Sequence, residues 1–140
     1  MCRSVFIASV SFLLTLPVFG AEQDVFGEFL VEDRGSKIKI FDCGDGTPCG
    51  KVTWIDPATL EDGQSVEDVT SKSGQKILGM QILSGFAKGK RDWRGGKIYS
   101  PEADKTYSSK LKRVDNNTLQ VKGCIAFLCE TQIWTLATTK

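Results

Sequence analysis

Apolar and polar residues alternate along much of the chain in short runs. Residues 37–43 read KIKIFDC, which places two isoleucines on one face and two lysines on the other. A period of two is typical of a strand with one buried face, and glycine, proline, asparagine and aspartate at the breaks indicate turns. The pattern predicts eight strands, at residues 27–31, 37–43, 49–55, 80–86, 93–100, 105–114, 118–125 and 130–136.

Strands in this number and of this length predict an all-β fold. Most connections are tight, which favours an antiparallel sheet in which neighbours in sequence lie side by side. Closing the sheet into an eight-stranded up-and-down β-barrel removes its exposed edges and leaves an interior for side chains or one small ligand. One polar stretch, Asp56 to Lys76, interrupts the pattern. We predict that it is a long loop with one short helical turn, and such loops are functional or mobile.

The first twenty residues have a different pattern. Arg3 precedes an apolar run, Val5 to Leu16, and small residues follow up to Gly20. This order is typical of a secretory signal peptide, and the run is shorter than the about 20 residues that span a bilayer. We therefore expect a signal peptide at residues 1–20, a single barrel domain at residues 21–140, and no transmembrane segment.

Four cysteines remain beyond this segment: Cys43, Cys49, Cys124 and Cys129. In an exported chain they imply two disulfides. Three pairings are open, of which the local one is the simplest; the alternative is that the pairs cross-link two loops that meet in space. A zinc site is disfavoured, because structural zinc sites separate paired cysteines by about two to four residues and oxidised sulfur suits an exported chain.

Charge and composition exclude several classes of function. Without residues 1–20 the chain carries 17 basic and 17 acidic residues, and it lacks the concentrated positive surface that nucleic-acid binding needs. It contains no histidine, which excludes Ser-His-Asp and Cys-His catalysis and histidine metal sites. We therefore predict no catalytic residue, no metal, no cofactor and no enzymatic activity. The enzyme alternative would use the loop carboxylates, which a solvated loop explains more simply: Asp56, Glu61, Asp62, Glu67 and Asp68.

Aromatic residues on the predicted strands are the candidate ligand site. We predict that Trp54, Trp93, Tyr99 and Tyr107 form the wall of a pocket. Lys51 and Lys97 accompany them and would present charge at its mouth. In the alternative interpretation the aromatic rings form the core and the lysines face solvent.

Several segments resemble one bacterial family. Residues 95–108, GGKIYSPEADKTYS, carry the most specific match, and CGKVTWI and QIWT support it. The family is the bacterial exported family catalogued as domain of unknown function 2147, and the resemblance runs from about Phe26 to Thr135. It implies a periplasmic or secreted bacterial protein with a lipocalin-like β-barrel and no established activity.

The chain departs from the family pattern at two positions. The first strand of the family reads G-x-W and its last strand W-x-R, whereas this chain has Phe29 and Leu136 at those places. In lipocalin-like barrels such a tryptophan can stack under such an arginine. Replacing both partners would give an apolar contact and leave no guanidinium without a partner. We therefore predict that Phe29 and Leu136 touch at the closed end of the barrel.

These observations favour a non-enzymatic barrel that binds a small apolar or extended ligand at one open end, with the long loop as its rim. The alternative is a structural or interaction module of the cell envelope with a protein partner. That alternative predicts a filled interior and one exposed apolar or charged patch.

Overall fold

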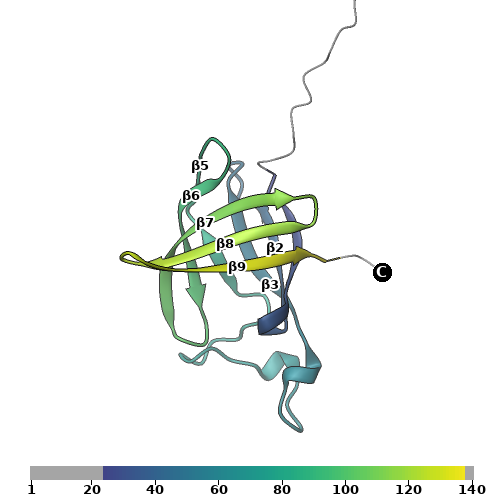
Figure 1. Cartoon of the computed structure of the whole chain (residues 1–140). Helices are drawn as coiled ribbons and strands as arrows, with labels where there is room; N and C mark the ends of the chain where they lie inside the picture. The colour runs from purple at the N-terminus through teal and green to yellow at the C-terminus, as the bar shows by residue number, and fades with distance from the viewer. Residues whose placement is uncertain (1–23, 138–140) are drawn as a thin grey trace, which may run out of the picture.

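The computed structural model describes residues 24–137, and within this range nine strands form one antiparallel sheet (Figure 1). The predicted signal peptide lies outside the described residues. The strands are β1 (Gly27–Val31), β2 (Ser36–Asp42), β3 (Pro48–Ile55), β4 (Gln81–Ser84), β5 (Ala87–Lys88), β6 (Trp93–Ser100), β7 (Lys105–Asp115), β8 (Thr118–Ile125) and β9 (Leu128–Leu136).

The sheet closes into a barrel. Strands adjacent in sequence pair with each other except β4 and β5, β1 pairs with β9, and β4 pairs with β6. Eight of the strands described here therefore complete the ring, and β5 is a two-residue addition that pairs with β6. The predicted fold class is confirmed, and each predicted strand is present within two residues of its expected ends. β5 was not predicted, because two residues are too few to show a period.

One end of the barrel is filled by apolar side chains. Phe29, Leu83, Leu111 and Leu119 are fully buried, and Val25, just before β1, is buried with them. These residues alternate with less buried ones along their strands, and on β7 the buried Ser109 and Leu111 lie between exposed neighbours. The closed end is therefore a conventional packed core.

Phe29 and Leu136 meet at this closed end, as predicted. They are direct partners in the ladder between β1 and β9. Partners on one face of an antiparallel pair have Cβ atoms about 4.5–5.5 Å apart, which brings their side chains into contact. The structure adds an arginine that the sequence did not predict here. The guanidinium of Arg113, on β7, lies 5.2 Å from the ring centre of Phe29.

The long loop is packed rather than free. It contains two short 3₁₀ turns, η2 (Pro57–Thr59) and η3 (Val66–Asp68), where one had been predicted. Its apolar side chains, which include Leu60 and Val69, are half-buried against the core. Lys72 donates its backbone N–H to the carbonyl of Pro101 at 2.9 Å, which ties the loop to the β6–β7 turn. Figure 1 shows the loop at the same end of the barrel as η1 (Glu32–Arg34).

Two glycines of the family-like GGKIY segment have different physical roles. Gly95 has a φ of 69°, a left-handed conformation that glycine adopts readily, and it lies where the register between β6 and β7 shifts. Gly96 is buried against the ring of Phe86. A Cβ on Gly96 would lie 2.3 Å from the nearest ring atom of Phe86, which is itself 4% exposed. The second glycine is therefore required by close packing.

Gly96→Ala is expected to destabilise the protein by about 1–3 kcal/mol, because the added methyl group overpacks a closed core. Urea unfolding of the disulfide-intact protein measures the change. The double variant Gly96→Ala with Phe86→Leu, which removes the clashing ring, should lose less stability than the sum of the two single variants. Simple additivity of the two losses would contradict this explanation.

Candidate ligand cavity

A cavity of about 770 Å³ occupies the other end of the barrel. The rim consists of η1, the long loop, the β6–β7 turn and the tip of the β8–β9 hairpin. Below the rim the lining is largely apolar, because inward positions of the strands supply it: Val31, Ile38, Val52, Ile55, Ile82, Ile98, Val121 and Trp134. Period-two alternation thus fills one end of the barrel and lines a hollow at the other.

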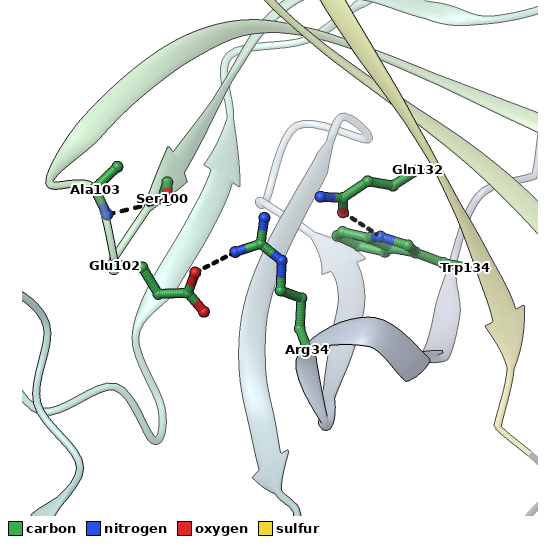
Figure 2. A network of polar contacts seen from close by, with 6 residues as sticks. All are labelled: Arg34, Ser100, Glu102, Ala103, Gln132 and Trp134. Atoms are coloured by element: carbon green, nitrogen blue, oxygen red, sulfur yellow. Dashed lines mark hydrogen bonds and ion pairs between the residues drawn. The ribbon is translucent and has the colours of Figure 1, made fainter. Parts of the chain in front are cut away.

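Strand β9 adds a polar stripe to this wall. Glu130, Gln132 and Trp134 are alternate residues of β9 and all line the cavity. The indole Nε1–H of Trp134 donates to Oε1 of Gln132 at 2.9 Å (Figure 2). Trp134 is 2% exposed, so this hydrogen bond satisfies a donor that would otherwise be buried without a partner.

An ion pair crosses the rim. Arg34, at the end of η1, pairs through Nη1 with the carboxylate of Glu102 in the β6–β7 turn (Figure 2). Gly35 ends η1 with a φ of 53°, and a Cβ there would lie 2.6 Å from a methyl carbon of Thr59. The glycine therefore lets η1 pack against the long loop. This packing places Arg34 at the cavity, where it and Glu102 both belong to the lining.

The tip of the β8–β9 hairpin extends the apolar lining to the surface. Ile125 is 46% exposed and Leu128 71% exposed, yet both line the cavity. Phe127, between them, is 91% exposed. The disulfide Cys124–Cys129 closes the tip below these residues. The hairpin tip therefore adds exposed apolar side chains to the mouth of the cavity.

Both disulfides have the local pairing that the sequence favoured. Cys43 is bonded to Cys49 across the β2–β3 turn, and Cys124 to Cys129 across the β8–β9 turn. The cross-linked alternative is wrong because the two hairpins lie at opposite ends of the barrel. Each bridge closes a short loop and in the chain-entropy model contributes about 2 kcal/mol.

The predicted site residues divide into two groups. Tyr99 and Tyr107 line the cavity, and the hydroxyl of Tyr99 donates to Asp104 at 2.7 Å. A ligand-binding role for these two residues stays a prediction. The other four are not part of this lining: Trp54, Trp93, Lys51 and Lys97.

Each of these four has a different environment. Trp54 is half-buried, with Nζ of Lys37 at 5.0 Å from its ring centre. Trp93 is buried at the closed end, where it borders a shallow depression beside the β2–β3 turn. Lys51 and Lys97 are exposed, and Nζ of Lys51 lies 5.3 Å from the ring centre of Phe41.

Sequence reasoning missed Arg34, Glu102, Glu130 and Gln132. A signal existed for β9, because its alternation puts Glu130 and Gln132 on the same face as the buried Trp134. A polar residue beside a buried tryptophan on the same face indicates a polar contact inside the barrel, which Gln132 makes with Trp134. Arg34 and Glu102 lie in turns far apart in sequence, where no period could have joined them.

Two turn carboxylates away from the cavity have shifted pKa values. Hydrogen bonds from the hydroxyl and backbone N–H of Thr47 lower the pKa of Asp45. The backbone N–H of Asn117 and the side chain of Thr118 lower the pKa of Asp115. Both carboxylates stabilise hairpin turns, β2–β3 and β7–β8, in their ionised form.

The described residues were found to contain neither a membrane-spanning helix nor a group of metal-binding side chains. Within residues 24–137 no helix is long and apolar enough to cross a membrane. Over the same residues, no three histidine, cysteine, aspartate or glutamate side chains gather where a metal ion could be held.

Residues 27–136 match a family described as an uncharacterized protein conserved in bacteria, DUF2147. The chain belongs to this family. No protein of curated function matches it significantly. The two disulfides of this DUF2147 protein indicate a location outside the bacterial cytoplasm, because the cytoplasm keeps thiols reduced.

A solved structure resembles this DUF2147 chain in fold. It is protein HP1028 from the human pathogen Helicobacter pylori, which is described as belonging to the lipocalin family. The TM-score is 0.62 and the sequence identity 18%, with 82% of this chain and 84% of that chain covered. The similarity shows a lipocalin-like barrel, and at this identity it shows the fold alone.

Proposed function

We propose that this DUF2147 protein is a non-enzymatic binder that holds one small, largely apolar molecule inside its barrel, in the bacterial periplasm or after secretion. One observation carries the proposal. The barrel interior is a cavity of about 770 Å³ with apolar walls, and polar and charged groups lie mainly toward its rim. Ligand sites typically measure about 300–1,000 Å³ and combine apolar walls with a few polar groups.

The envelope-module alternative has less support. It predicted a filled interior, and only one end of the barrel is filled. Its second expectation, an exposed apolar patch, is met at the hairpin tip by Phe127 and Leu128. Because Leu128 also lines the cavity, the tip is equally explained as the outer part of a ligand entrance.

A binding titration tests the proposal. Disulfide-intact protein is titrated with N-phenylnaphthylamine, a neutral apolar dye whose fluorescence rises when it leaves water. We expect saturable binding at one site, roughly micromolar in affinity, and displacement by dodecanol. Native mass spectrometry of protein isolated from its own cell envelope fraction should show one bound small molecule. Absence of saturable dye binding together with a ligand-free mass would contradict the proposal.

A further inference from the structure

The guanidinium of Arg34 has donors to spare at the cavity rim. An arginine side chain offers five N–H donors in a planar fork. Within residues 24–137 its hydrogen-bond and ion-pair contacts consist of the one from Nη1 to Glu102. The remaining donors make no hydrogen bond to other residues within 24–137. We infer, on the basis of the proposed function, that the ligand is an amphipathic molecule whose anionic headgroup binds Arg34.

The position of Arg34 suits a headgroup. Figure 2 shows its guanidinium between the carboxylate of Glu102 and the hydrogen-bonded pair of Gln132 and Trp134. Arg34, Gln132 and Trp134 all line the cavity, and the apolar walls lie below them. An apolar tail in the barrel would therefore bring the head of the same molecule to the guanidinium.

The existing ion pair is easily exchanged. The side chain of Glu102 is 67% exposed and that of Arg34 37% exposed. Pairs this accessible are weak, because water and salt screen them. A ligand carboxylate or phosphate would accept from the same fork, and the fork geometry of arginine fits either group in a bidentate manner. The headgroup would take the place of Glu102 with little loss.

A cationic headgroup fits the charged residues of the lining less well than an anionic one. These residues are Arg34, Glu102 and Glu130. A cation at Glu102 would have to compete with Arg34. Glu130 is exposed beside the hairpin tip, so its charge is well hydrated. Arg34 is less exposed than Glu102, its partner in the ion pair, and it has N–H donors without a hydrogen bond. Both features favour an anionic headgroup over a cationic one.

Matched amphiphiles test the inference. Dodecanoate, dodecyl phosphate, dodecanol and dodecylamine share one tail and differ in the head, and each is used at neutral pH to displace N-phenylnaphthylamine, below its aggregation concentration. Both anions, or the better fitting of the two, should bind about fivefold more tightly than dodecanol. Their relative affinities distinguish a carboxylate from a phosphate head. The preference should decrease as salt is added.

Two variants assign the effect to the ion pair. Arg34→Gln should remove the preference for anions over dodecanol, and circular dichroism with thermal unfolding shows whether the variant is folded. Glu102→Gln removes the competing carboxylate and should strengthen anion binding about twofold. Equal binding of all four heads, tighter binding of dodecylamine, or an unchanged preference in Arg34→Gln would overturn the inference. Failure of the dye and dodecanol to bind would instead contradict the proposed function.

Discussion

Gly123→Phe is expected to abolish ligand binding while the barrel stays folded. Gly123 lies on β8 and lines the cavity. A Cβ there would be 3.5 Å from a methyl carbon of Ile98 and 3.7 Å from Cβ of Tyr107, which is ordinary van der Waals contact. The backbone at Gly123 is also not in a left-handed conformation. A side chain can therefore be added, and the free space available to it is the cavity.

The phenyl ring would take the volume that the ligand needs. We expect the affinity for N-phenylnaphthylamine to fall at least about thirtyfold, which corresponds to about 2 kcal/mol. Gly123→Ala is the matched control, because it adds the same Cβ and leaves most of the cavity open. Its affinity should stay within about threefold of the wild type. Thermal unfolding and circular dichroism of both variants show whether the barrel is retained.

A Gly123→Phe protein that is folded and binds the dye normally would place the dye site outside the barrel. The exposed hairpin tip, with Phe127 and Leu128, would then be the first place to look. This outcome would contradict the proposed function, whereas loss of folding in Gly123→Phe alone would shift the test to Gly123→Leu, which adds a smaller side chain.

The strands and their order could be predicted because their causes are local. Alternation in residues 37–43 reports which side chains face inward, and glycine and aspartate mark the β2–β3 turn. A sheet built from sequential hairpins can take few topologies, and a closed barrel is the one that has no exposed edge strand. The disulfides follow from the hairpins, since each pair of cysteines flanks a tight turn.

Which aromatic side chains face the barrel interior could be predicted less well than the strands. A strand that gains one residue at a bulge presents the opposite face beyond it. The register shifts between Lys37 and Ile38 on β2, opposite Trp54, and again between Trp93 and Gly96 on β6. Both bulges therefore lie where aromatic residues had to be assigned to a face. The Arg34–Glu102 pair was beyond reach for another reason, since 68 residues separate its members.

At the closed end the sequence predicted the pairing of Phe29 with Leu136 but not the arginine that lies over the Phe29 ring. The family resemblance implies tryptophan and arginine where this chain has Phe29 and Leu136, and these two residues are ladder partners as predicted. Yet an arginine still lies over the ring, supplied by Arg113 of β7. Its Nε donates to the carbonyl of Asp115 at 2.9 Å and its Nη2 to that of Asn116 at 2.7 Å. A contact between an aromatic ring and an arginine is thus present at this end of the barrel, but β7 supplies the arginine instead of β9.

Phe29→Ala is expected to destabilise the protein by about 3–5 kcal/mol, measured by urea unfolding. The side chain of Phe29 is fully buried, so its removal loses apolar contact and leaves a cavity in a packed end. Phe29→Leu keeps most of the apolar volume against Leu136 and should lose clearly less. It is also the variant of choice where Phe29→Ala does not fold.

A double-mutant cycle isolates the ring–guanidinium contact. The guanidinium carbon of Arg113 lies 5.2 Å from the Phe29 ring centre, and Nη1 of Arg113 is buried without a hydrogen-bond partner, so the ring contributes a favourable contact to this charge. The cycle combines Phe29→Leu with Arg113→Gln, and the turn hydrogen bonds lost with Arg113 cancel because they are lost in both backgrounds. We expect a coupling energy of about 1 kcal/mol. Additive losses would mean that Arg113 is held by the turn carbonyls alone, and that Phe29 contributes only apolar packing to the closed end.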